Sequence, residues 1–196
     1  MSTHGLLLAA GAGTRFGGPK ALARDADGSA WLLRALAALR PCAGITVVLG
    51  AGASQAAGLV PPSVRAVLAA RWADGLGASL RAGLDAVAAS DHDAVLVSLV
   101  DLPDVDARVT QRVLAAASGA SALARATYGG VPGHPVLLGR AHWDGVLATA
   151  VGDRGAGSYL AAHIDRVRGV ECGDLASGAD VDVNTGAGLR PGGVRA

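Results

Sequence analysis

Several residue types are scarce in this chain of 196 residues, and each scarcity excludes a class of protein. Aromatic side chains make up 3% of the chain, and the two cysteines are Cys42 and Cys172. Two cysteines are too few for a disulfide framework or a metal cluster, so we expect free thiols in a cytoplasmic protein. The formal net charge of +1, without a basic cluster, argues against nucleic acid and anionic membranes as partners. No apolar run approaches the ~20 residues that a membrane-spanning helix needs.

Lysine occurs once: Lys20 is the one lysine in the sequence, and it follows a glycine-rich stretch directly. Small apolar residues are abundant instead, since hydrophobic residues make up 51% of the chain and alanine is the commonest of them. This composition is typical of helices packed closely on a sheet. The 29 glycines are too many for plain helices and must populate loops.

Short apolar runs alternate with longer amphipathic segments, which predicts strands alternating with helices. We expect strands at Gly5–Ala10, Ile45–Gly50, Val64–Ala69, Asp93–Val100, Ala122–Thr127, Pro135–Leu138 and Arg166–Val170. We expect helices at Ser29–Arg40 with Ser29 as its N-cap, Ala53–Leu59, Gly75–Ser90, Asp106–Ala117, Arg140–Thr149 and Arg154–His163. This order predicts a three-layer α/β/α fold with a Rossmann-like, mostly parallel sheet. We expect one domain over residues 1–189 and a disordered tail over 190–196.

The segment Leu8–Lys20, after the first expected strand, carries the clearest chemistry. Its four glycines let the backbone turn sharply and present N–H groups to phosphate oxygens, and Arg15 and Lys20 add positive charge. Neither common phosphate motif fits, because Gly17 falls one place late for a dinucleotide fingerprint and Pro19 precedes the lysine where a P-loop has glycine. Ligands bind beyond the carboxyl ends of parallel strands, so this loop and Asp101 should share one edge of the sheet.

Residues 8–20 resemble the LAAGxGxRxGxPK signature of sugar-nucleotide and MobA-like nucleotidyltransferases, with a match at every fixed position. Other segments are similar to the family's pattern in the same order along nearly the whole chain: Trp72–Leu80, Asp101–Pro103, Gly133–Pro135, Gly152–Ala156 and Asp182–Thr185. Two of them, Gly133–Pro135 and Gly152–Ala156, resemble the branch of molybdenum cofactor cytidylyltransferases. The chain departs from the pattern at Ala69–Arg71, where the family often has Asn-Pro, and at Gly186–Gly188, which replaces Pro-Glu-Asp.

This resemblance implies the fold of the nucleotide-diphospho-sugar transferases (GT-A-like) and the transfer of a nucleotide from an NTP to a phosphate-bearing acceptor, with release of pyrophosphate. It implies catalytic roles for Lys20, Arg15 and Asp101. It implies nucleotide contacts for Leu8, Ala9, Ala10, Gly11, Ala12, Gly13, Thr14, Gly75 and Ser79. Asp101, Asp182 and Asn184 would hold Mg²⁺, which keeps several waters and needs few protein ligands. His134 and Asp153 would contact the acceptor.

In the family that this chain resembles, the start of the loop correlates with the base of the nucleotide. Ala10 gives L-A-A-G, which is typical of cytidylyl members, whereas guanylyl members commonly have L-A-G-G. The resemblance therefore implies CTP and a molybdopterin acceptor, with transient contact to a molybdoenzyme or insertase. Three alternatives stay open: a guanylyltransferase, a non-catalytic nucleotide or cofactor carrier, and a dinucleotide-dependent oxidoreductase. Helix capping stays an alternative role for Asp101 and Asp153, and a packed core position for His134 and Trp72.

Overall fold

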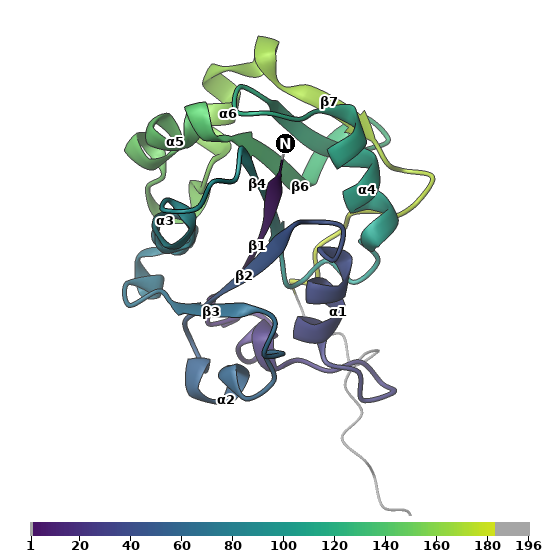
Figure 1. Ribbon diagram of the computed structural model, residues 1–196. Coiled ribbons are helices and arrows are strands. Elements are labelled where there is room, and N and C mark those ends of the chain that lie inside the picture. The colour runs from purple at the N-terminus through teal and green to yellow at the C-terminus, as the bar shows by residue number, and fades with distance from the viewer. Residues whose placement is uncertain (1, 183–196) are drawn as a thin grey trace, which may run out of the picture.

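One seven-stranded sheet organises residues 2–182, the part of the chain that the computed structural model describes (Figure 1). Its strands are β1 (Thr3–Ala9), β2 (Gly44–Leu49), β3 (Arg65–Leu68), β4 (Ala94–Leu99), β5 (Leu123–Tyr128), β6 (Val131–Gly139) and β7 (Arg168–Glu171). They lie in the order β3-β2-β1-β4-β6-β5-β7. Strand β6 runs antiparallel to its neighbours β4 and β5, and the other pairs are parallel. The predicted α/β fold with a mostly parallel sheet is confirmed.

Helices cover both faces of this sheet, which gives the three layers that the sequence predicts (Figure 1). The α-helices are α1 (Trp31–Ala38), α2 (Ala53–Ala57), α3 (Leu76–Val87), α4 (Ala107–Ala116), α5 (Trp143–Thr149) and α6 (Gly157–Ala162). Short 3₁₀ turns are η1 (Lys20–Leu22), η2 (Trp72–Asp74), η3 (Arg140–His142), η4 (Gly152–Arg154) and η5 (Ile164–Arg166). Within residues 2–182, no helix is both long and apolar enough to cross a membrane.

Successive residues of the central strands pack on opposite faces, because side chains alternate along a strand. In β1, Leu7 packs in the cluster that includes α1 and α4, whereas Leu6 and Leu8 pack in the cluster with α3, α5 and α6. Strand β4 is buried on both faces along nearly its whole length, as expected for the apolar run that precedes Asp101. The two cores therefore fix the carboxyl ends of β1 and β4 side by side.

Two local predictions are wrong, and both concern how helices begin. Ser29 is not the N-cap of α1, since Ala30 holds that position and gives no side-chain hydrogen bond. Ser29 instead closes a tight turn, where its carbonyl accepts from the amide of Asp25 and its amide donates to Asp27. Helix α6 begins at Gly157 rather than Arg154, because Gly155 has a φ of 50°, which a helix cannot accommodate.

Candidate active site

A cavity of about 610 Å³ opens at the carboxyl ends of β1 and β4. The loop after β1 forms one wall, the start of α3 forms another, and the residues after β4 form a third. All nine residues predicted to contact the nucleotide line it: Leu8, Ala9, Ala10, Gly11, Ala12, Gly13, Thr14, Gly75 and Ser79. Arg15, Lys20, Asp101, Asp153 and Asp182 line the same cavity. Asn184 lies outside the described residues, as do the expected domain limit at residue 189 and the tail.

The glycine-rich loop closes on one carbonyl group. The amides of Phe16, Gly17 and Gly18 all donate to the carbonyl oxygen of Gly13, at N···O distances of 3.0, 2.9 and 3.0 Å. Gly13 has a φ of 59°, and a Cβ there would overlap the carbonyl oxygen of Gly18. The buried Phe16 ring packs 5.1 Å, between centroids, from the ring of Trp31 and anchors the loop on the core. Gly13 is therefore required for the loop's shape.

Residues 12–15 line the cavity. Within residues 2–182, the amides of these four residues donate no hydrogen bond to another protein group. A run of unbonded amides beside an arginine side chain suits the oxygens of a phosphate group.

Four charged side chains meet at the rim of this loop. The ammonium group of Lys20 lies 2.7 Å from Oδ2 of Asp101 and 3.2 Å from Oδ1 of Asp182, and Arg15 pairs with Asp182 at 3.1 Å. Burial lowers the pKa of Lys20, but its hydrogen bonds and charge interactions with Asp101 and Asp182 outweigh burial and raise the pKa. The pKa of Asp182 is lowered, first by the hydrogen bond from Lys20. Lys20 is thus held as a cation between two carboxylates.

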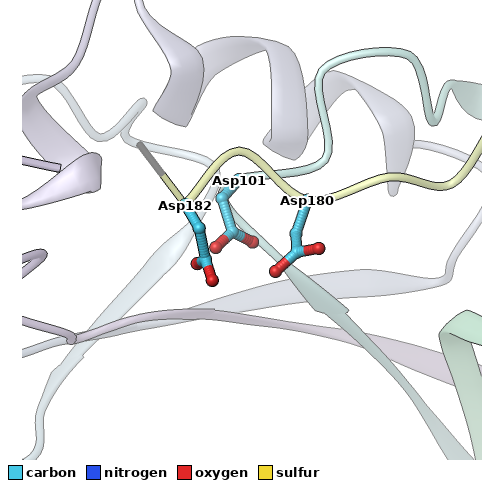
Figure 2. A group of neighbouring side chains, drawn as sticks. All are labelled: Asp101, Asp180 and Asp182. Atoms are coloured by element: carbon cyan, nitrogen blue, oxygen red, sulfur yellow. The ribbon is translucent and has the colours of Figure 1, made fainter. Parts of the chain in front are cut away.

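The structure adds Asp180, which the sequence analysis missed. Figure 2 shows the carboxyl groups of Asp101, Asp180 and Asp182 beside one another, and their nearest oxygens lie within 4.8 Å. The amide of Val181 donates to the carbonyl of Asp101 at 3.1 Å, so the two other aspartates flank Asp101. Spacing of i and i+2 places two side chains on the same side of an extended segment, a signal that was present in the sequence. Oδ1 of Asp101 is buried, and within residues 2–182 it has no hydrogen-bond partner.

The segment of residues 172–182, which carries Asp180 and Asp182, is fastened to the sheet at several points. Arg112 of α4 forms a two-pronged ion pair with Asp174, and the amide of Ser177 donates to Asp104 at 2.6 Å. These contacts bring the segment from the far edge of the sheet, after β7, back to the end of β4. Asp180 and Asp182 therefore reach Asp101 through tertiary packing rather than through closeness in the sequence.

Tyr128, at the end of β5, is the main side chain under this segment. Its ring leaves no room for a Cβ at Gly133 or Gly178, and its hydroxyl donates to the carbonyl of His134 at 2.6 Å. The side chain of His134 does not line the cavity. Burial, with a smaller contribution from the nearby charge of Arg125, lowers the pKa of His134 to about 4, so the imidazole is neutral at pH 7.

Two glycines at the start of α3 shape the opposite wall. A Cβ on Gly75 would lie 2.6 Å from the backbone of Gly152, and one on Gly77 would lie 2.7 Å from the carbonyl oxygen of Ala150. Because these two glycines have no side chain, residues 150–153 can pack against the helix, and this packing brings Asp153 to the cavity. Asp153 lies inside η4, so it is not the N-cap of α6, which is Ala156.

The cavity thus brings unbonded amides and two cations together with three carboxylates, and these groups suit phosphate oxygens and a divalent cation chemically. The model of the MobA-like NTP transferase domain matches residues 5–167. The chain belongs to the MobA-like NTP transferase family. This nucleotidyltransferase domain match covers Lys20, Asp101 and Asp153 but ends before Asp180 and Asp182.

Three relatives are similar to this chain over most of its length. Nicotine blue oxidoreductase from Paenarthrobacter nicotinovorans is 33% identical over 195 residues, which cover 91% of each chain. Among solved structures, Rv0371c from Mycobacterium tuberculosis is 26% identical with a TM-score of 0.74, over 93% of this chain and 94% of that one. A crystal structure of the same mycobacterial protein is a complex with manganese. A nucleotidyl transferase from Methanothermobacter, Mth528, shares the fold with a TM-score of 0.76 at 21% identity, over 93% and 92% of the chains.

Proposed function

We propose that this MobA-like enzyme transfers a nucleoside monophosphate from CTP to the phosphate group of molybdopterin and releases pyrophosphate. One observation carries the proposal. Lys20 and Asp101, which are 2.7 Å apart, meet at the cavity that the glycine-rich loop walls, so a phosphate-binding cation and a metal-binding carboxylate share one site.

The reaction asks little covalent chemistry of the protein. An oxygen of the acceptor phosphate forms a bond to the α-phosphorus of the NTP, while the bond from that phosphorus to the oxygen bridging to the β-phosphate breaks. The acceptor phosphate is anionic at neutral pH, so no strong general base is needed, and catalysis depends on positioning and charge neutralisation. The loop amides hold the triphosphate, Arg15 contacts its outer oxygens, and Lys20 stabilises charge on the α-phosphate and the leaving group.

The carboxylates fit a divalent cation, for which we propose Mg²⁺. Oxygen ligands suit it, and the buried Oδ1 of Asp101 has no hydrogen-bond partner among residues 2–182. The manganese complex of Rv0371c supports the use of a divalent cation. Asp101 and Asp182 would hold the cation together with Asn184. When bound, it neutralises charge on the phosphate oxygens.

The finer assignments rest on the family pattern. Ala10 and Gly133–Pro135 favour CTP and a molybdopterin acceptor, and we expect transient contact with a molybdoenzyme or insertase in the cytoplasm. We assign acceptor contact to Asp153, which lines the cavity. His134 does not line the cavity, so this proposal gives it no direct contact with the acceptor.

The test is pyrophosphate release by the purified protein with Mg²⁺, molybdopterin cofactor and CTP, GTP, ATP or UTP in separate reactions. We expect release with CTP, and its loss in Lys20→Ala and Asp101→Ala but not in the exposed Arg24→Ala. Release with GTP alone would move the protein to the guanylyl alternative. Absence of release with every NTP would favour the carrier alternative.

A second candidate is an oxidoreductase, which the name of the relative at 33% identity favours. Oxidation of NADH or NADPH with an organic acceptor, in the absence of any NTP, would support it. The spacing of Gly17 in the loop argues against a dinucleotide site, so we expect no such oxidation.

A further inference from the structure

The carboxylate cluster already holds a cation, and that cation is a side chain. Lys20 Nζ lies 2.7 Å from Asp101 and 3.2 Å from Asp182, two of the three aspartates whose oxygens lie within 4.8 Å of one another. We propose that Lys20 and the divalent metal occupy this cluster in turn, and that the nucleotide drives the exchange. The inference rests on the proposed function, since it uses the NTP as the ligand that moves Lys20.

Size and charge keep Lys20 and a metal ion from occupying the cluster together. A metal ion bound by Asp101 and Asp182 would contact the same carboxylates that Lys20 now bridges, at a distance where two cations repel strongly in a partly buried site. The side chain of Lys20 is 13% exposed and that of Asp101 is 16% exposed, so water screens this repulsion poorly. The metal therefore binds weakly while Lys20 stays between the two aspartates.

The balance of charge at the cluster changes when a nucleotide arrives. Three carboxylates face Lys20 and Arg15, so the cluster without nucleotide carries a small net negative charge. A triphosphate brings several negative charges to the loop amides beside Lys20, and its oxygens compete for the ammonium group. Once Lys20 turns to the phosphates, Asp101 and Asp182 lose their cationic partner. The metal ion that accompanies the NTP then takes the place of Lys20 beside these two carboxylates.

Asp180 has a defined part in this exchange. It belongs to the cluster, yet neither Lys20 nor Arg15 pairs with it. We assign Asp180 as the third carboxylate for the metal. This explains why an exposed aspartate is held beside Asp101 by the backbone bond from Val181.

The test is Mn²⁺ binding without nucleotide, measured by the loss of the free-ion signal in electron paramagnetic resonance. Lys20→Met should bind Mn²⁺ at least ~10-fold more tightly than the wild type, because the competing charge is gone. Lys20→Arg keeps the positive charge, so its affinity for Mn²⁺ should stay as weak as that of the wild type. Arg24→Met removes a distant positive charge and should not change the affinity for Mn²⁺. Adding Asp180→Asn to Lys20→Met should cancel much of the gain, whereas the exposed Asp91→Asn, at the other end of β4, should not.

A second readout needs no variant. Lys20 is the one lysine of the sequence, so a sample labelled at the lysine Nζ gives one side-chain signal in nuclear magnetic resonance. Mg²⁺ alone should leave that signal in place, and Mg²⁺ with a non-hydrolysable CTP analogue should shift it.

Two results would overturn the exchange: Lys20→Met that binds Mn²⁺ no more tightly than the wild type, or a lysine signal that moves fully with Mg²⁺ alone. If either result is found in a preparation that does release pyrophosphate from CTP, the exchange fails and the proposed function stands. If Mn²⁺ behaves as expected and no NTP is consumed, the function fails and the competition between lysine and metal stands.

Discussion

Among single residues, Gly13 meets the strictest requirement in the site. It combines a positive φ with a place where a Cβ would overlap the carbonyl oxygen of Gly18. Three amides converge on its own carbonyl, so any shift at Gly13 moves the whole loop. The sequence pattern marks this glycine among several, but it does not show that its neighbour Gly18 has open space around it.

Gly13→Ala should cost about 1–3 kcal/mol of stability from backbone strain and steric overlap. The displaced amides should raise the KM for the NTP by ~10-fold or more, a change of about 1.4 kcal/mol in binding. Gly18→Ala is the matched control, because its Cβ would meet no atom within 4 Å and its φ is not positive. Thermal unfolding measures the loss of stability, and nucleotide titration measures the loss of affinity. Equal melting temperatures and equal nucleotide affinities for the two variants would contradict the role of Gly13 in shaping the loop.

Trp72 reports on the same cavity. It lines the cavity wall, whereas Trp31 and Trp143 are buried in the cores with their indole N–H groups bonded to Asp25 and Leu138. Binding of CTP should therefore change the intrinsic fluorescence mainly through Trp72. Trp72→Phe should remove the change, and a response that survives in this variant would place the nucleotide elsewhere.

At the scale of elements, the segment of residues 172–182 decides whether the carboxylates meet. Gly178 has a φ of 65°, and a Cβ there would lie 2.1 Å from a ring carbon of Tyr128. Gly178→Ala should push this segment off the sheet and carry Asp180 and Asp182 away from Asp101. We expect weaker Mn²⁺ binding in the presence of CTP and a lower kcat, with a small effect on nucleotide affinity.

Gly157→Ala serves as the control for that variant, since its Cβ would meet nothing within 4 Å and α6 lies on the other face of the sheet. A Gly178→Ala protein with unchanged Mn²⁺ affinity would show that this segment does not position the cation.

The elements also differ in how well the sequence predicts them. The apolar run of β4 and the glycine loop were predicted correctly, because burial and turn chemistry leave local marks. The antiparallel direction of β6 was not predicted, although Gly129 and Gly130 between two strands are a hairpin signal that the sequence carries. Asp180 was missed because only the packing of residues 172–182 brings it to Asp101. Ser29 was misassigned because a serine suits a tight turn as well as a helix cap.

At the scale of the whole molecule, the two ends of the sheet differ in character. The cavity lies at the carboxyl edge, and at the opposite edge the imidazole of His4 bonds to Thr46 at 2.9 Å. Burial, followed by the nearby charges of His92 and Arg65, lowers the pKa of His4 to about 4. A lowered histidine pKa means that the unfolded chain takes up the proton more readily.

The contribution of His4 to the free energy of unfolding should therefore be fully present above pH 6.5, the ordinary pKa of histidine. This contribution should be lost as the pH drops toward 4. His4→Gln keeps a partner for Thr46 and should reduce the slope of the melting temperature across this range, and the slope that remains should come from His134, whose pKa is also lowered to about 4. Because His4 lies at the edge away from the cavity, pyrophosphate release at pH 7 should stay unchanged. A slope as steep as that of the wild type would show that other groups govern the acid limb.

The central claim is nucleotidyl transfer at the cavity of Lys20 and Asp101, and the most direct measurement follows the phosphate itself. Two CTP samples, one labelled in the α-phosphate and one in the γ-phosphate, are incubated with the protein, Mg²⁺ and molybdopterin cofactor. The account predicts that the α-label moves to the acceptor product and the γ-label to pyrophosphate, and that Lys20→Ala prevents both. An α-label that stays in CTP or appears as free CMP, or a γ-label released as single phosphate, would contradict it.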